Sequence, residues 1–291
     1  MAIVLLPFGK PERHRERLAE LLIGDSMRLQ GDLTGRKSLG DLSSSDHLIL
    51  GASSRTLTAS QSGLKCHVSL LLQEPVAIKP RFYTFCRLFG HRYYRILTHS
   101  SMLLSKLSNA RFTVHGGAFV STAGVLKPLK QHRISMVASS KNSTIGHRLR
   151  HRIAAWSKEA ATDLKLFGTA YLRVEDKREA HDKYFFSVCI ENSRTSGYFT
   201  EKLIDSFLCR SLPIYWGAPD IAHFFDPRGM ICCSSETELQ NVIQNITEAD
   251  YQVRLPYLEE NIHRAIGVSD FYANALNALK MEDDFNLNRA A

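Results

Sequence analysis

A polar stretch in the second half of the chain combines a carboxylate, an amide, hydroxyls and a cation. The run Phe185–Ile190 is short, apolar and rich in β-formers, and Glu191 and Asn192 follow it directly. Thr200 is a suitable N-cap for the helical pattern that comes next, and it places Lys202 in the first turn of that helix. Because helix N-termini attract anions, this strand, loop and helix predict a phosphate site.

A second stretch with similar chemistry is "SSKNSTIGHRLR", Ser139–Arg150, which follows an apolar run and opens a helix at a glycine. It lacks the Gly-Lys-Ser/Thr ending of a Walker motif, and it is not a G-x-G-x-x-G motif. The alternative interpretation is a basic helix start that is exposed to solvent and binds no ligand. The phosphate interpretation gains weight because both stretches follow strands of one predicted sheet, and ligands bind beyond the carboxyl ends of such strands.

The remaining motifs give weaker evidence for a functional site. In "LPIYWGAPDIAHFF", Leu212–Phe225, Gly217 ends an apolar run, which would let a ligand ring approach the backbone or would simply mark a turn. The twelve histidines show no H-E-x-x-H spacing, so no metal site is predicted. No G-x-S-x-G elbow is present, which gives acyl transfer no nucleophile.

Strand-like and helix-like segments alternate along both halves of the chain, which is typical of parallel sheets covered by helices on both faces. The expected strands are Ile3–Leu6, His47–Leu50, Val68–Leu72, Tyr94–Leu97, Phe112–Val114, Ile134–Ala138, Leu164–Phe167, Tyr184–Ile190, Leu212–Trp216 and Met230–Cys233. The expected helices are Pro11–Ile23, Ser100–Leu107, Gly146–Ser157, Thr200–Cys209 and Glu236–Ile246. We predict an N-terminal domain over residues 1–130 and a C-terminal domain with further C-terminal helices over 131–291.

The charge is divided unevenly between the halves. Residues 1–150 carry 22 Lys/Arg against 8 Asp/Glu, and no carboxylate lies between Glu74 and Glu159. The bases are scattered singly, which indicates a basic surface on a folded domain. No apolar run approaches the roughly 20 residues of a membrane span, the N-terminal apolar run is too short for a signal peptide, and the six cysteines are expected to be free thiols.

The stretch "FSVCIENSRTSGYFTEKLIDSFLCRSLPIYWGAP" resembles the donor-binding signature of the α-1,3/4-fucosyltransferases, particularly the bacterial type. The similarity continues through "VASSKNSTIGHRLRHRI" and covers roughly residues 133–235, whereas the first 65 residues are too divergent to compare. The resemblance implies an α/β fold of GT-B type, with two Rossmann-like domains facing across a cleft. It also implies GDP-fucose as donor and inversion at the sugar carbon.

The resemblance implies roles for individual residues. Lys202 and an arginine before the second domain's first helix would contact the diphosphate; Arg150 fits that position, with Arg148 as the alternative. Glu201 would hold the ribose hydroxyls, and Tyr171 would lie near the guanosine. The remaining donor-site residues would be Glu191, Asn192, Ser193, Tyr198 and Thr200, of which Asn192 and Tyr198 line the fucose and phosphate side.

Inverting transfer needs a base on the acceptor side, and the family uses a glutamate of its first domain. Glu74 is the only carboxylate between Asp46 and Glu159, and it follows the apolar run "VSLLL". A glutamate that merely ends a surface strand would look the same. The alternative carboxylates are Asp25, Asp32, Asp41 and Asp46, and His115 is an alternative base or acceptor contact.

The leading hypothesis is therefore an inverting fucosyltransferase that moves fucose from GDP-fucose to a glycan hydroxyl, in α-1,3 linkage, with no essential cofactor or metal. The alternatives are a related transferase that uses another nucleotide sugar, and a non-catalytic basic protein that binds glycans or nucleic acid. The predicted partners are an anionic or lipid-linked glycan and a membrane surface, not nucleic acid. The expected location is the cytoplasm, with peripheral membrane contact.

Overall fold

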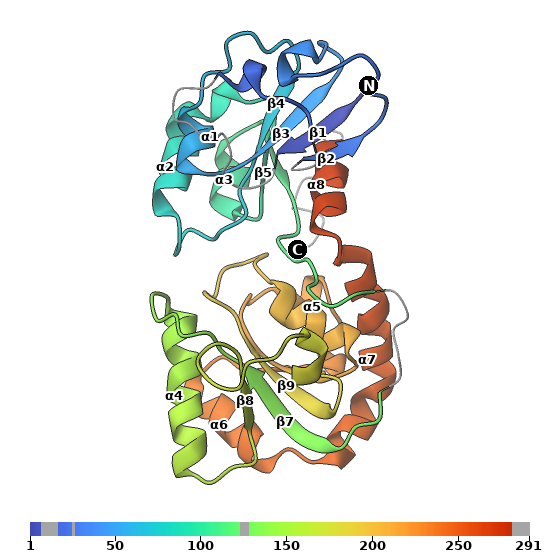
Figure 1. Cartoon of the computed structure of the whole chain (residues 1–291). Helices are drawn as coiled ribbons and strands as arrows, with labels where there is room; N and C mark the ends of the chain where they lie inside the picture. The colour runs from blue at the N-terminus through green and yellow to red at the C-terminus, as the bar shows by residue number, and fades with distance from the viewer. Residues whose placement is uncertain (7–16, 25–26, 123–127, 281–291) are drawn as a thin grey trace. The chain divides into compact units, whose positions relative to one another are not determined.

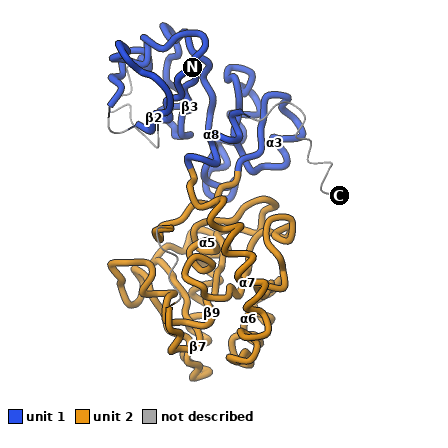
Figure 2. The backbone as a smooth tube through the Cα atoms, turned by 90° about the vertical axis from the view of Figure 1, so that its right-hand side faces the viewer, with its two compact units in different colours: residues 1–113, 272–289 blue, residues 114–271, 290–291 orange. Residues whose placement is uncertain are grey.

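The computed structural model describes residues 1–6, 17–24, 27–122 and 128–280 of the 291 residues. The chain forms two compact α/β units, coloured separately in Figure 2. Of the described residues, unit 1 comprises Met1–Thr113 together with the segment from Tyr272 to Lys280, and unit 2 comprises Val114–Phe271. The division therefore falls after Thr113, whereas the sequence analysis placed it after residue 130.

Hydrogen bonds from backbone N–H groups explain why the boundary between the units falls after Thr113 and not after residue 130. The N–H of Ala118 donates to the carbonyl of Ser269 at 2.8 Å. The N–H groups of Phe119 and Val120 donate to Asp205 Oδ1 at 2.8 and 3.1 Å. These residues precede the first strand of the unit 2 sheet, yet their hydrogen bonds bind them to unit 2.

The C-terminal end of the described chain also differs from the expectation. The helix α8 (Phe271–Lys280) belongs to unit 1 from Tyr272 onward, not to the C-terminal unit. The Arg28 guanidinium lies 4.8 Å from the centre of the Tyr272 ring, a cation–π contact within unit 1.

Unit 1 contains a six-stranded sheet in the order β2-β1-β3-β4-β5-β6 (Figure 1). Five strands are parallel, and β2 pairs antiparallel with β1 at the edge. The parallel strands are short and almost wholly buried, as expected when helices cover both faces. The elements are β1 (Ile3–Leu6), β2 (Arg28–Gln30), β3 (His47–Gly51), α1 (Ser54–Thr58), β4 (His67–Leu71), α2 (Pro80–Phe89), β5 (Ile96–Thr98), α3 (Ser101–Lys106) and β6 (Ala110–Phe112).

Unit 2 contains a five-stranded parallel sheet in the order β11-β10-β9-β7-β8. The helices α4 and α6 pack together on one face of this sheet, and α5 and α7 pack together on the other (Figure 1). The elements are β7 (His132–Val137), α4 (Ile145–Glu159), β8 (Lys165–Phe167), β9 (Tyr184–Ile190), α5 (Glu201–Leu208), β10 (Leu212–Trp216), β11 (Ile231–Cys232), α6 (Glu236–Asn245) and α7 (Glu248–Val268). Short 3₁₀ helices lie at Leu18–Glu20, Leu39–Asp41, Gly90–Arg92, Lys177–Ala180, Ile221–His223 and Pro227–Gly229.

The predicted α/β fold class is confirmed, and each expected strand has a counterpart within a few residues. Residues 11–16 of the expected helix Pro11–Ile23 lie outside the described residues, and the described remainder forms only the 3₁₀ helix Leu18–Glu20. β2, α1 and α2 have no counterpart among the elements expected from the sequence. The six cysteines are free, as expected.

Candidate functional site

The carboxyl edge of the unit 2 sheet has a point where the chain leaves neighbouring strands in opposite directions. From β7 the chain crosses to β8 through α4, and from β9 it crosses to β10 through α5. Since β7 and β9 are neighbours, the N-termini of α4 and α5 flank one position of the sheet. Such a switch point is where open parallel sheets bind ligands.

The start of α4 approaches the end of β9 very closely, and only a glycine permits this. The Gly146 N–H donates to the Asn192 carbonyl at 3.2 Å. A Cβ atom on Gly146 would lie 1.7 Å from the Glu191 carbonyl oxygen. Thr144 fixes the helix start as its N-cap, with its hydroxyl accepting the His147 N–H at 3.1 Å. The two predicted anion-binding stretches are thus joined backbone to backbone.

Gly146→Ala is expected to lower the free energy of unfolding by more than about 2 kcal/mol, because the new methyl group has to displace the β9–α5 backbone. Gly267 is the matched control, since nothing lies within 4 Å of a Cβ at this position of α7. There alanine should stabilise the chain by about 0.5–1 kcal/mol. Urea denaturation measures both changes, and parental stability of Gly146→Ala would contradict the close approach described here.

Arg150 is the cation that α4 directs into this site. It is only 4% exposed, and its Nη2 donates to Asn192 Oδ1 at 2.6 Å. Asn192 Nδ2 in turn donates to the Tyr198 hydroxyl at 3.4 Å. Burial lowers the pKa of Arg150, while the carboxylates of Glu191 and Glu201 oppose that shift. The guanidinium therefore stays charged, with a buried Nε that has no hydrogen-bond partner in the described part of the chain.

Glu191 holds the β9–α5 loop in place. Its carboxylate accepts the Thr200 N–H and the Thr200 hydroxyl, both at 2.8 Å, and it is fully buried. Burial raises the pKa of Glu191, although the Lys202 ammonium opposes the shift. We infer that Glu191 fixes the loop that carries the site, and that its more exposed neighbours contact the ligand.

Glu201 and Lys202 form the exposed part of the same site. Lys202 Nζ donates to Glu201 Oε1 at 2.8 Å and to Thr200 Oγ1 at 3.2 Å. Their side chains are 28% and 21% exposed, so a ligand can reach both. Burial lowers the pKa of Lys202, but the Glu201 and Glu191 carboxylates outweigh it and the pKa lies above its usual value. A fixed ammonium, a buried guanidinium and a helix N-terminus together can neutralise a diphosphate.

Three predicted donor residues make their contacts outside this cluster. Arg148 is exposed, and its Nη1 donates to the carbonyls of Asn142 and Ser143 at 3.3 Å. The Lys158 ammonium lies over the Tyr171 ring, 5.5 Å from the ring centre. Ser193 is buried and shares a hydrogen bond with the Thr195 hydroxyl at 3.1 Å. The helix geometry thus favours Arg150 over Arg148 as the anion-binding arginine.

The sequence left two interpretations of Gly217 open, room for a ligand ring or a simple turn, and the structure shows protein side chains beside it. A Cβ at this position would lie 2.2 Å from the Tyr215 hydroxyl and 2.7 Å from Glu191 Cγ. The glycine therefore makes room for the protein's own buried Glu191. A ligand ring is not needed to explain it.

The predicted base, Glu74, belongs to unit 1. It follows β4 by three residues, at the carboxyl edge of that sheet, and it is half-buried. The Tyr83 hydroxyl donates to its backbone carbonyl at 2.8 Å. Its carboxylate forms no hydrogen bond or ion pair with any described residue.

The alternative aspartates are engaged in local structure. Asp32 accepts the N–H of Thr34, and Asp41 accepts the N–H of Ser38. Asp46 is fully buried, and burial would raise its pKa, but hydrogen bonds from Ser43 and Ala2 and the charge of Arg36 lower the pKa to about 2. Asp25 lies outside the described residues. Among the described carboxylates of this set, Glu74 alone has unused oxygens at the carboxyl edge of the sheet.

His115, an alternative base or acceptor contact in the sequence, has an aromatic neighbour that the sequence did not predict. The His115 ring lies 4.9 Å from the Tyr198 ring, and it is half-buried. Next to it, a Cβ on Gly116 would lie 3.0 Å from the Phe199 ring, so the backbone passes close over the β9–α5 loop. Asp205 holds this segment through Phe119 and Val120, and burial raises the pKa of its carboxyl to about 7. The pair Gly116-Gly117 was the only sequence signal for this approach.

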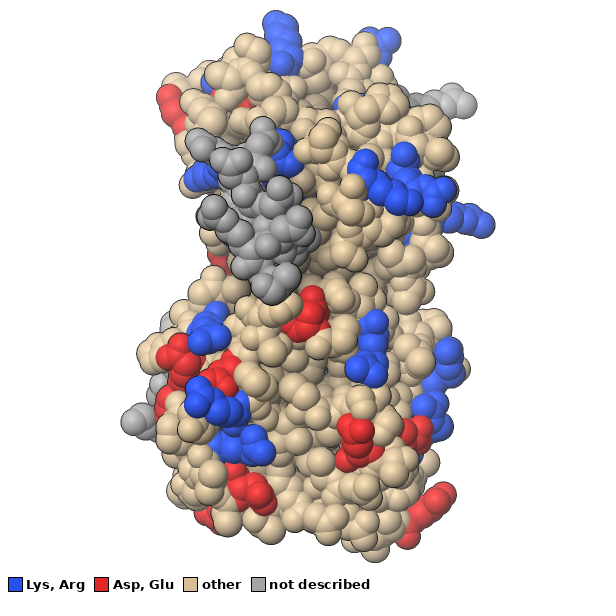
Figure 3. Space-filling view, turned by 180° about the vertical axis from the view of Figure 1, so that it is seen from behind, with Lys and Arg blue, Asp and Glu red and all other residues tan. Residues whose placement is uncertain are grey.

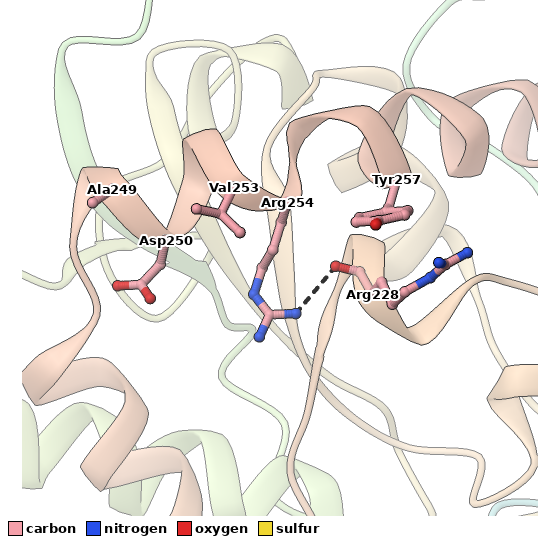
Figure 4. A pocket seen from close by; sticks show the side chains of 6 residues that line it. All are labelled: Arg228, Ala249, Asp250, Val253, Arg254 and Tyr257. Carbon is pink, nitrogen blue, oxygen red and sulfur yellow. Dashed lines mark hydrogen bonds between the residues drawn. The ribbon is translucent and has the colours of Figure 1, made fainter.

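A cavity of about 360 Å³ lies elsewhere in unit 2, between α7 and the 3₁₀ helix Pro227–Gly229 (Figure 4). None of the predicted site residues lines it. Arg254 donates to the Arg228 carbonyl at 3.1 Å, and Arg228 pairs with Asp226 and stacks on Tyr257. Because both arginines already have partners, this cavity is a poor candidate for a phosphate site.

Among the described residues, no three His, Cys, Asp or Glu side chains converge as metal ligands would. None of the described helices combines the length and the apolar character that crossing a bilayer requires.

Comparisons with known proteins bear on both units. Residues 128–257 match the family model described as "Glycosyltransferase family 10 (fucosyltransferase) C-term". The chain is 28% identical to the Alpha-(1,3)-fucosyltransferase FucT of Helicobacter pylori over 187 residues. These residues are 64% of this chain but only 36% of that protein, so the chain spans about a third of that relative's length.

Solved structures show the same fold over both units. A crystal structure of an alpha1,3-fucosyltransferase matches with a TM-score of 0.51 at 17% identity, covering 85% of this chain and 82% of that one. The Anabaena protein HepE, in complex with UDP, matches with a TM-score of 0.55 at 10% identity, covering 81% and 78%. The fold is of GT-B type, as the sequence predicted. Residues 128–257 of unit 2 are therefore similar to the C-terminal domain of glycosyltransferase family 10, a family of fucosyltransferases.

Proposed function

We propose that the chain is an inverting fucosyltransferase that moves fucose from GDP-fucose to a hydroxyl of a glycan, in α-1,3 linkage. The observation that carries this proposal is the cluster of Arg150, Asn192, Tyr198, Glu201 and Lys202 at the switch point of unit 2. Its cations suit a nucleoside diphosphate, and its carboxylate suits ribose hydroxyls. The family and the Helicobacter pylori relative support fucose as the sugar.

The proposed reaction needs charge neutralisation as the diphosphate leaves. Arg150 and Lys202 would supply two positive charges, and the N-terminus of α5 would add its dipole. A neighbour of the same fold was crystallised with UDP, which supports the nucleotide class. We therefore propose that no metal ion is essential, since these groups can carry the charge that a metal would otherwise neutralise.

The acceptor is proposed to be an anionic or lipid-linked glycan. The excess of Lys and Arg in residues 1–150 supports this, because opposite charge raises the local concentration of such an acceptor. The attraction would be screened within about 8–10 Å at ordinary ionic strength. Transfer to a sialylated or phosphorylated acceptor should therefore fall more steeply with added salt than transfer to a neutral one.

The proposal is tested by nucleotide titration followed by a transfer assay. Calorimetry should show that GDP binds and that UDP does not, and GDP-fucose should be consumed with a glycan acceptor in the presence of a chelator. The anomeric configuration of the product, read by NMR, reports inversion. Equal binding of UDP, or faster turnover of another GDP-sugar, would favour a related transferase; GDP binding without any transfer would favour a non-catalytic protein.

A further inference from the structure

The end of α2 carries an exposed patch that the proposed function does not use. Because β4 and β5 are parallel, α2 returns the chain from the carboxyl edge of the unit 1 sheet to its amino edge. The Tyr94 N–H donates to the Val68 carbonyl at 2.7 Å, which places this turn at the start of β4. We call the residues of this turn the basic apolar patch: Arg87, Leu88, Phe89, His91, Arg92, Tyr94 and Arg95.

The patch exposes large apolar side chains close together. Leu88, Phe89 and Tyr94 are 59%, 44% and 39% exposed. Phe89 also pairs with the half-buried Phe85, at 5.1 Å between ring centres, which widens the apolar area. Tyr83 and Cys86 fill the core on the opposite face of α2. The outward apolar residues are therefore surplus to the packing of unit 1, and a cluster of this kind marks an interaction surface.

Positive charge surrounds these apolar groups. Arg87, His91 and Arg92 are exposed, and neither arginine pairs with a carboxylate of the described residues. The Arg95 guanidinium stacks on the Tyr94 ring at 5.0 Å. α3 ends with the exposed Lys106 at the same edge of the sheet. Figure 3 shows Lys and Arg side chains gathered on one side of unit 1, with no acidic side chain among them.

The acidic groups of this edge are not available to oppose that charge. Asp46, which precedes β3, is fully buried and pairs with Arg36 at 3.0 Å. No carboxylate occurs between Glu74 and Glu159 in the sequence. The patch thus combines net positive charge with exposed Leu and Phe side chains, which are the two features of an interfacial membrane contact.

We propose that the basic apolar patch docks unit 1 on an anionic membrane surface. Leu88 and Phe89 enter the headgroup region while Arg87, His91 and Arg92 contact lipid phosphates. An adjacent, exposed leucine and phenylalanine suit a bilayer better than nucleic acid, where flat aromatic groups stack on bases and aliphatic groups contribute little. Because the patch lies at the amino edge of the unit 1 sheet, docking leaves the opposite edge with Glu74 uncovered.

Vesicle co-sedimentation tests the proposal with the full chain. Vesicles of phosphatidylcholine with about one-third phosphatidylglycerol should bind the chain, pure phosphatidylcholine vesicles should not, and added salt should weaken binding. Two paired variants, Leu88→Ser with Phe89→Ser and Arg87→Glu with Arg92→Glu, should each lower vesicle affinity about tenfold or more. Since all four side chains are exposed, the variants should remain folded, and thermal melting checks this.

Matched controls come from exposed residues of unit 2. Val253→Ser with Ile266→Ser removes exposed apolar groups from α7, and Lys165→Glu with Arg173→Glu reverses two exposed charges. Both controls should bind vesicles like the parent. Equal loss in patch and control variants would overturn the proposal, as would equal binding to neutral vesicles. A patch that proves to mediate self-association or RNA binding, with no vesicle binding, would overturn it as well. GDP affinity should not change in any variant, so failure here is separable from failure of the proposed function.

Discussion

Arg150→Ala and Lys202→Ala are each expected to weaken GDP binding by about 1.5–3 kcal/mol, the range for hydrogen bonds to charged groups. Arg150 projects from α4 onto Asn192, and Lys202 lies in the first turn of α5, so the two cations approach the same switch point from different elements. Arg148→Ala is the matched control from the same helix. Its side chain bonds only to the loop before α4, and GDP affinity should stay at the parental value.

Calorimetric titration with GDP and with guanosine separates phosphate contact from general damage. Loss of a diphosphate contact weakens GDP binding and leaves guanosine binding unchanged, whereas a distorted site weakens both. Arg150 is buried, so Arg150→Lys is a second variant that keeps the charge and loses the fixed fork of donors. Arg148→Ala weakening GDP as much as Arg150→Ala would show that the wrong arginine has been assigned.

The sequence predicted the strands of both sheets because their residues are short apolar runs. β9 and β10 have nearly every residue buried, and this pattern needs no tertiary information. β2 was missed for the opposite reason, since Arg28–Gln30 are all exposed and owe their conformation to pairing with β1. α2 was missed because Tyr83 and Cys86 are its only buried residues, too few for a clear helical period.

The local structure around each site residue could be predicted from the sequence, but the contacts between distant segments of the site could not. Glu191, Asn192, Thr200 and Lys202 follow a recognisable strand and N-cap, so their local geometry could be deduced. The choice between Arg148 and Arg150 depends on which face of α4 meets the β9–α5 loop. That face is set by the approach of Gly146 to Glu191, a contact between segments 45 residues apart in the chain. The packing of residues 114–120 on unit 2 likewise rests on Asp205, far along the sequence.

Glu74→Gln is expected to lower fucosyl transfer by about 10²–10⁴-fold, the usual contribution of a general base. The amide keeps the size of the side chain and its hydrogen bonding, but it cannot accept the acceptor's proton at neutral pH. GDP binding should not change, because the cations and the helix N-terminus that would bind the diphosphate belong to unit 2. Initial rates with saturating GDP-fucose measure the first effect, and calorimetry measures the second.

The control for this variant is a second carboxylate of unit 1. Asp32→Asn removes a negative charge from an exposed turn, where the side chain bonds only to Thr34 in its own loop. Transfer should stay near the parental rate, since this carboxylate already serves local structure. Glu74 differs because its carboxylate has no partner among the described residues, while Tyr83 holds only its backbone carbonyl, so the carboxylate is available to accept a proton. A Glu74→Gln protein that transfers fucose at nearly the parental rate would remove Glu74 from the mechanism and leave His115, beside Tyr198, as the next residue to replace.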